Sequence, residues 1–112
     1  MPDFLYDSES HFDWDKANLS HIAAHGITPE EAEQVIFNRP IDLGTHLRDG
    51  EDRTAQLGET SAGKILHLIS TMRETKIRII TAWPAKERSR RYFLSLKRNG
   101  NVGRIEEQDL RE

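Results

Sequence analysis

The sequence predicts an α+β fold, a single domain in which two N-terminal helices precede a small antiparallel β-sheet and one C-terminal helix follows it. Helix start and stop signals occur before Pro40, whereas short runs of alternating apolar and polar residues separated by turn residues begin at Ile41. Pro84 then opens a cationic amphipathic segment. A length of 112 residues suits one core. We expect this core to span about residues 11–98, with flexible polar ends at 1–10 and 101–112.

The first helix is predicted from the shared helical face of Leu19, Ile22 and Ala23. Gly26 is placed to end this helix after His25, because glycine readily adopts the left-handed conformation that terminates helices. The preceding residues, His11 to Trp14, have the composition of a short strand.

The second helix has a clear start signal. Thr28 is a good N-cap, Pro29 suits the first helical position, and Glu31 stands three residues after the cap. This spacing is that of a capping box. The helix is expected to bury Ala32, Val35 and Ile36 and to end before Pro40.

Four β-like runs and a last helix complete the expected fold. Turn pairs such as Asp49-Gly50 separate the runs, and connections this short favour an antiparallel meander. The runs are Ile41 to Leu47, Arg53 to Leu57, Ile65 to Met72 and Lys76 to Trp83. The helix, Ala85 to about Lys97, should turn Ala85, Ser89, Tyr92, Phe93 and Leu96 toward the sheet.

Composition excludes several classes of protein. No run approaches the roughly 20 apolar residues that span a bilayer, and Met1 to Glu30 has no cationic region followed by an apolar one. We therefore expect a cytoplasmic location. The chain has no cysteine, which excludes disulfides, thiolate metal sites and cysteine nucleophiles.

The net charge of −3 hides a segregation of charge along the chain. Residues 1–63 hold 13 acidic and 4 basic side chains, residues 64–104 hold 2 acidic and 11 basic, and residues 105–112 hold 4 acidic and 1 basic. These give −9, +9 and −3. A basic segment within an acidic chain is typical either of a surface that binds polyanions or of a solvated face.

Several motifs share an order and spacing with a known family. They are Trp14-Asp15, His25-Gly26-Ile27, Glu30-Glu31-Ala32, an arginine opening a strand that ends in Leu57-Gly58, the strand Ile77-Arg78-Ile79-Ile80-Thr81-Ala82, and Pro84-Ala85 before an arginine-rich helix. In these the chain resembles the BrnT family, the small toxins of bacterial type II toxin-antitoxin modules.

The resemblance implies a RelE-like domain and a ribonuclease that uses neither a metal nor another cofactor. It also implies a neutralising antitoxin as partner, typically a ribbon-helix-helix DNA-binding protein that represses the operon, in an assembly that can hold two copies of each chain.

Metal-free RNA cleavage needs an acid/base pair and cations that stabilise the transition-state phosphate. Strand alternation places Arg78 on one face with Ile80 and Ala82, opposite Ile77, Ile79 and Thr81, as expected at the floor of a partly buried anion site. Arg53 repeats the pattern one strand earlier. The alternatives are a solvent-facing arginine at 78 and, for Arg53, an arginine paired with Glu51 or Asp52.

His25 and Glu31 are the candidates for proton transfer. His25 ends the first helix, where the helix dipole favours a cation, so it is either a proton donor or only a capping histidine. Glu31 is either a general base or only a member of the capping box. His21 and His25 stand four residues apart without a third ligand in register, so we predict no metal site. His67 is interpreted as a core histidine.

Aromatic and cationic residues near the last helix are candidates for RNA binding. The indole of Trp83 can stack on a base or pack at the junction of strand and helix, and Tyr92 offers the same two possibilities. The candidate phosphate contacts are Lys86, Arg88, Arg90 and Arg91. The competing hypothesis is a non-catalytic module whose basic face binds RNA or protein.

Overall fold

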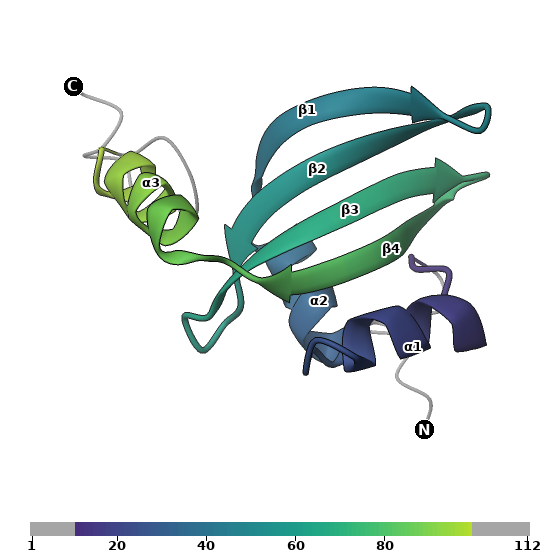
Figure 1. Ribbon diagram of the computed structural model, residues 1–112, viewed down its shortest axis with the longest axis horizontal. Coiled ribbons are helices and arrows are strands. Elements are labelled where there is room, and N and C mark those ends of the chain that lie inside the picture. Colours follow the sequence, from purple (N-terminus) through teal and green to yellow (C-terminus); the bar gives the residue numbers. More distant parts are fainter. Residues whose placement is uncertain (1–10, 100–112) are drawn as a thin grey trace.

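The computed structural model describes residues 11–99, which form three helices and one four-stranded antiparallel sheet of strand order β1-β2-β3-β4 (Figure 1). The predicted α+β class and the meander are confirmed. The elements are α1 (Lys16–Ala23), α2 (Pro29–Phe37), β1 (Ile41–Arg48), β2 (Glu51–Glu59), β3 (Ile65–Arg73), β4 (Lys76–Pro84) and α3 (Glu87–Arg98). The ends expected to be flexible, 1–10 and 101–112, lie outside the described residues.

Both N-terminal helices begin at capping boxes. In α2, Thr28 Oγ1 accepts a bond from the Glu31 backbone N–H at 3.1 Å, and Glu31 Oε1 accepts one from the Thr28 N–H at 3.0 Å. This confirms the predicted start. In α1 the cap is Asp15, whose carboxylate accepts bonds from the first-turn N–H groups. Gly26, at φ 76°, ends the α1 turn in the left-handed conformation.

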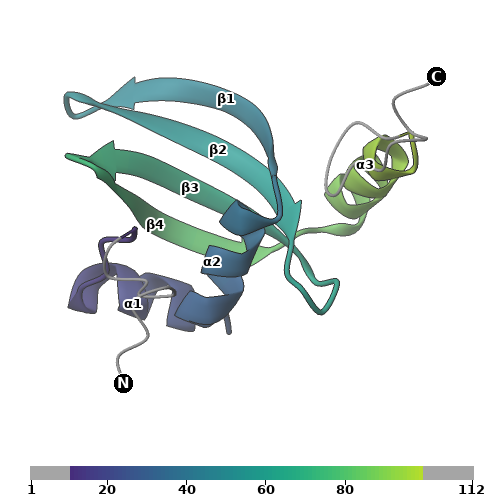
Figure 2. The ribbon, with the colours of Figure 1, turned by 180° about the vertical axis from the view of Figure 1, so that it is seen from behind.

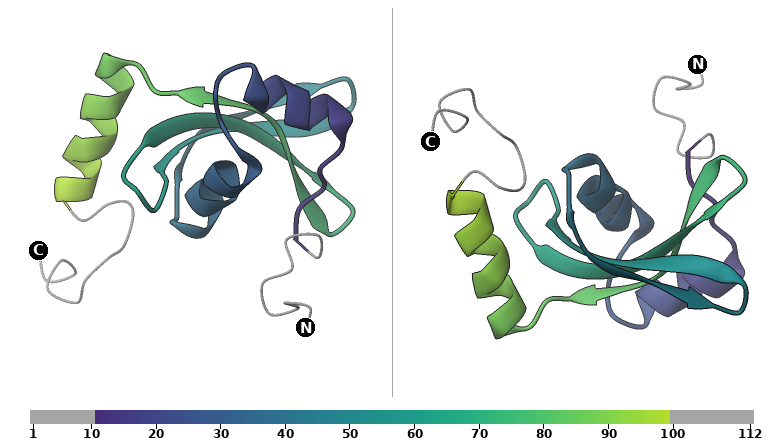
Figure 3. Two further views of the ribbon diagram at one scale, coloured as in Figure 1. Left: turned by 90° about the horizontal axis from the view of Figure 1, so that it is seen from below. Right: turned by 90° about the horizontal axis from the view of Figure 1, so that it is seen from above.

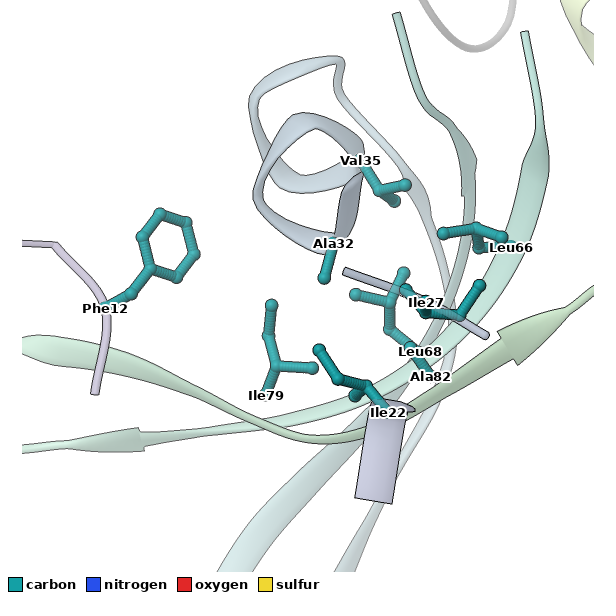
Figure 4. Packing of buried hydrophobic residues seen from close by; sticks show 9 residues of the cluster. All are labelled: Phe12, Ile22, Ile27, Ala32, Val35, Leu66, Leu68, Ile79 and Ala82. Carbon is teal, nitrogen blue, oxygen red and sulfur yellow. The ribbon is translucent and has the colours of Figure 1, made fainter. Parts of the chain in front are cut away.

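The main core lies between the sheet and α2, with α1 contributing one side chain (Figure 4). Figure 2 shows α2 lying against one face of the sheet, which we call the α2 face. The core members are Phe12, Ile22, Ile27, Ala32, Val35, Leu66, Leu68, Ile79 and Ala82. Of the three apolar residues on the predicted face of α1, only Ile22 is buried, whereas Leu19 and Ala23 are exposed. The reason is that α1 packs along the edge of the sheet, against β4, rather than over its face.

The outer edge of β4 is covered by the N-terminal segment and α1. The Asp13 N–H donates to the Ile77 carbonyl, and the Ile77 N–H donates to the His11 carbonyl. Where the sequence predicted a short strand, the structure has a single β-bridge between Phe12 and Ile77. The buried Asn18 amide then donates to the Ile79 carbonyl at 3.0 Å. An edge strand whose backbone groups are bonded in this way offers no template for pairing with another chain.

A β-bulge in β4 decides which side chains share a face. Thr81 pairs with Ile69 and Ile79 pairs with Ser70, so Ile80 is the extra residue. Simple alternation had placed Ala82 on the face of Arg78. The bulge reverses this, because Ala82 pairs with Leu68 and joins the core.

The other face of the sheet consequently carries Trp83, Thr81 and Arg78 on β4. Directly opposed residues point to the same side, so His67 and Thr71 on β3 lie on this face as well. Leu57 on β2, which pairs with His67, extends the face across the sheet. We call it the second face.

Helix α3 stands across one end of the sheet, beside the ends of β2 and β4 (Figure 3). It buries Phe93 completely in a smaller core with Leu57, Ile65 and Ala85. Tyr92 was predicted to join this packing, but its residue is 51% exposed. The prediction is wrong because α3 contacts only the end of the sheet. The contact is filled by a narrow row of side chains centred on Phe93, and Tyr92 lies outside it.

Candidate functional site

A cluster of two aromatic rings and a hydroxyl joins the second face to the start of α3. The imidazole of His67 stacks on the indole of Trp83, with ring centroids 5.1 Å apart and planes 12° from parallel. This contact follows from the strand register, since the two residues are direct cross-strand partners. His67 Nε2 lies 3.1 Å from Ser89 Oγ in the first turns of α3.

A second imidazole approaches the same indole from α1. The ring centroid of His25 lies 6.5 Å from that of Trp83, with the planes tilted by 53°. His25 is exposed, just beyond the last turn of α1, and its backbone N–H is bonded to the Ile22 carbonyl at 3.0 Å. Three elements distant in sequence therefore bring His25, His67 and Ser89 around Trp83, and we call these four residues the Trp83 cluster.

The two imidazoles differ in environment. His67 is half-buried, and burial lowers its pKa below the usual value of 6.5 because the charged form loses solvation. A half-buried imidazole of this kind is neutral at neutral pH and can accept a proton. His25 stands in solvent.

Cationic side chains surround the start of α3. Lys86 is the N-cap, and neither Lys86 nor Arg88 takes part in an ion pair among residues 11–99. Both are exposed. Glu87, in contrast, binds Arg91 Nε at 3.0 Å and lies 3.8 Å from Arg90 Nη1. Of the four predicted phosphate contacts, Lys86 and Arg88 are thus available without breaking a contact, and Arg90 and Arg91 are paired within the helix.

Arg78 lies on the second face but is already matched by carboxylates. Its side chain is only 10% exposed, its Nη2 donates to Asp15 Oδ1 at 3.1 Å, and its Nη1 lies 3.6 Å from Asp13 Oδ2. The Arg78 guanidinium is the main reason that the pKa of Asp15 is lowered. The sequence predicted a buried cation at this position, and the structure shows one whose charge is balanced by the acidic N-terminal segment.

Arg53 also has a carboxylate partner. Its Nη2 lies 2.9 Å from Glu51 Oε2 and its Nε donates to the same oxygen at 3.0 Å. This is the alternative left open from the sequence, with Glu51 as the partner. Arg53 lies on the second face because it alternates with Leu57 along β2, and Arg78 lies there as the partner of Thr71 on β3. Among the described residues, the hydrogen bonds and ion pairs of both arginines go to other residues than those of the Trp83 cluster.

Glu31 is separated from the cluster because α2 covers the opposite face of the sheet. Its carboxylate binds Lys64 Nζ at 2.8 Å as well as the Thr28 backbone. Lys64 is the main cause of the lowered pKa of Glu31, and the Thr28 bond adds to it. A carboxylate held in its charged form is a weak base, so the geometry favours the structural role.

A hollow of about 570 Å³ on the α2 face does not suit a polyanion. The residues that line it include three acidic ones, Asp42, Glu51 and Asp52, and no lysine or arginine.

Within residues 11–99, no three His, Asp or Glu side chains are grouped so that they could hold a metal ion. None of the described helices is long and apolar enough to cross a membrane.

Comparison with known protein families gives one match. The family described as the ribonuclease toxin BrnT of type II toxin-antitoxin systems matches residues 14–89, more than half of the chain. This chain belongs to the BrnT family. Comparison with curated proteins found no match. The BrnT match begins at Trp14, whose indole N–H donates to the buried Glu33 at 2.8 Å, and it ends at Ser89 of the Trp83 cluster.

Sequence reasoning identified Trp83 and His25 but missed two members of the cluster. His67 was interpreted as a core histidine, and Ser89 as a packing residue of the last helix. A usable signal exists in the register: once Leu68 and Ala82 are recognised as core partners, His67 and Trp83 must oppose each other on the other face.

Proposed function

We propose that this BrnT protein is the toxin of a type II toxin-antitoxin module and an endoribonuclease that cleaves RNA without a metal. The observation that carries the proposal is the Trp83 cluster: a half-exposed indole with two imidazoles beside it, next to two exposed cations that have no acidic partner among the described residues. A base stacking on Trp83 would place the adjoining phosphates near the start of α3.

Each group has a chemical role in this proposal. The ammonium of Lys86 and the guanidinium of Arg88 would hold phosphate oxygens and stabilise the extra negative charge of the transition state. The exposed His25 would supply the proton that the leaving 5′-oxygen needs. The sequence-based catalytic roles of Arg78, Arg53 and Glu31 stay predictions. Arg90, Arg91 and Tyr92 are secondary RNA contacts, because the arginines must first leave Glu87.

The partner in this proposal is an antitoxin, of the ribbon-helix-helix type, in an assembly of two copies of each chain. It would lie over α3 and cover the Trp83 cluster, so that bound antitoxin excludes RNA. Charge attraction between an acidic antitoxin surface and α3 would make association faster at low salt than at high salt. Free toxin would act in the cytoplasm, where RNA cleavage would inhibit growth.

The test is cleavage of single-stranded RNA by the purified protein in the presence of a metal chelator, with Trp83→Ala and Leu47→Ala compared. Leu47 is exposed on β1, at the opposite end of the sheet from α3, and serves as the matched control. We expect wild type and Leu47→Ala to cleave equally. Loss of base stacking should weaken RNA binding by Trp83→Ala about tenfold or more.

Cleavage that requires an added divalent metal would contradict the metal-free mechanism. A matching DNA strand should not be cleaved, because it lacks the attacking 2′-hydroxyl.

A non-catalytic module that binds RNA or protein is the second candidate. The observation that favours it is the pairing of both strand arginines with carboxylates, which leaves Lys86 and Arg88 as the cations for a transition state. RNA binding without cleavage of any RNA, by a protein that leaves growth unaffected when expressed alone, would support this candidate.

A further inference from the structure

His67 is placed as more than a packing residue. Its ring is held on one side by the stacked indole of Trp83, and its Nε2 is held by the Ser89 hydroxyl at 3.1 Å. The pairing fixes both the plane of the imidazole and the direction of one nitrogen. A residue that only filled the core would need neither a hydroxyl partner nor partial exposure.

We propose that His67 is the proton acceptor for RNA cleavage and that Ser89 Oγ passes the proton to its Nε2. This inference rests on the proposed ribonuclease function and adds to it the group that activates the attacking oxygen. His25 and His67 would then form the acid and base of one reaction, beside a single indole.

The proposed step balances as an internal transesterification. The 2′-hydroxyl gives its proton to Ser89 Oγ while Ser89 gives its own proton to His67 Nε2. The 2′-oxygen forms a bond to the adjacent phosphorus, and the bond from phosphorus to the 5′-oxygen breaks. The 5′-oxygen takes a proton from His25. The products are a 2′,3′-cyclic phosphate and a 5′-hydroxyl, and no water, metal or oxidant is consumed.

The surroundings of His67 favour the accepting role. The strands on either side present the uncharged Leu57 and Trp83 to it, and α3 presents Ser89. The charged residues at the start of α3, Lys86, Glu87 and Arg88, are all exposed to solvent. Burial lowers the pKa of His67, so the ring stays unprotonated at neutral pH.

The test compares four proteins on one RNA in the presence of a chelator: wild type, His67→Ala, His67→Gln and the control His46→Ala. His46 is exposed on β1 and has no part in the proposed reaction. We expect wild type and the control to cleave equally and both His67 variants to lose about 100-fold or more in rate, as is typical for loss of a general base. His67→Gln retains a polar group for Ser89, so it keeps the measurement possible where the alanine variant unfolds.

Two further readouts separate catalysis from packing. Imidazole added to His67→Ala should restore cleavage in its unprotonated form, so that rescue rises with pH. Ser89→Ala should lose rate, whereas Ser89→Thr, which keeps the hydroxyl, should retain most of it. In wild type, kcat/KM should fall at acidic pH with a midpoint below 6.5, because the base must be unprotonated.

The outcomes distinguish the two proposals. Cleavage by wild type together with full activity of a folded His67→Gln overturns the role of His67 and leaves the ribonuclease function standing. Loss of rate without any rescue by imidazole also overturns it, in favour of a packing role. No cleavage by wild type overturns the ribonuclease function, and the role of His67 falls with it.

Discussion

Arg78 Nη2 donates to Asp15 Oδ1 across 3.1 Å, joining the first half of β4 to the start of α1. The two residues are 63 positions apart in sequence, and their contact closes the second face at the sheet edge. Asp15 is also the N-cap of α1. One carboxylate therefore begins a helix and neutralises a nearly buried guanidinium.

This geometry gives a prediction for Arg78. A guanidinium already bound to two carboxylates contributes chiefly to structure, so we expect Arg78→Lys to cleave RNA within a few-fold of wild type but to unfold at a lower temperature. Thermal unfolding by circular dichroism and cleavage with chelator measure the two effects. A loss of about 100-fold in the folded lysine variant would instead place Arg78 at the transition-state phosphate, as the sequence alone predicted.

Asp15→Asn is the matched control for Arg78. Asparagine is as good an N-cap as aspartate, so this variant removes the charge of the partner while keeping the helix start. It should shift thermal unfolding in the same direction as Arg78→Lys and leave cleavage unchanged.

The exposed cations at the start of α3 should set the salt dependence of RNA binding. Each phosphate contact on a single strand contributes a slope of about −0.7 to log K against log salt. We expect Lys86→Ala and Arg88→Ala each to reduce the slope by about that amount, and Arg91→Ala to change it less, because Arg91 is bound to Glu87.

The measurement uses a DNA strand or another uncleaved analogue at several salt concentrations. Arg48→Ala, at the far end of β1, is the control and should leave the slope unchanged. Equal slopes in all four variants would show that RNA binds elsewhere than at the start of α3.

The close approach of α2 to the sheet predicts a strict requirement at Gly58. A Cβ added there would lie 2.8 Å from Val35 Cγ1 and 2.9 Å from Pro40 Cβ, both shorter than normal van der Waals contact. Gly58→Ala should therefore lower the free energy of unfolding by about 1–3 kcal/mol. Urea unfolding measures this change. Gly63→Ala cannot serve as the control, because Gly63 has a positive φ and an alanine there would be strained by its backbone conformation alone. The control is therefore Ala55→Gly, on the second face of the sheet.

The bond between Glu31 and Lys64 predicts a pH dependence of stability. The pKa of Glu31 is lower in the folded protein than its usual 4.5, so the folded state favours the charged carboxylate. This stabilisation is present above pH 4.5 and is lost as pH falls through the folded pKa. Urea unfolding between pH 3 and 6 should show a smaller decline in Glu31→Gln than in wild type. An identical decline in both would assign the acid sensitivity to other carboxylates.

Local sequence signals predicted most of the fold. The Thr28 capping box, the left-handed Gly26 and the turn at Gly50 act through neighbouring residues, so they can be recognised without tertiary structure. Tertiary features were beyond those signals. The amide of Asn18 is buried because it bonds a β4 carbonyl, and Tyr92 is exposed because α3 meets only the end of the sheet.

The candidate site was predicted in part for the same reason. The cationic turn of α3 and Trp83 are visible in the sequence, but His67 acquires its place only from strand pairing, and Arg78 acquires its partners only when the N-terminal segment folds against β4. Contacts between residues far apart in sequence depend on the whole fold.

The unpaired Ile80 decides which face of the sheet Trp83 occupies, because one extra residue in the strand reverses the alternation of the side chains that follow it. Were Ile80 to pair regularly, Ala82 would lie opposite His67 and Trp83 would turn toward the crowded α2 core. Deleting Ile80 itself would instead keep the β3 partners of Thr81, Ala82 and Trp83, because the extra residue of a bulge has no partner of its own. A relative could therefore lose this one isoleucine and keep both the fold and the aromatic platform.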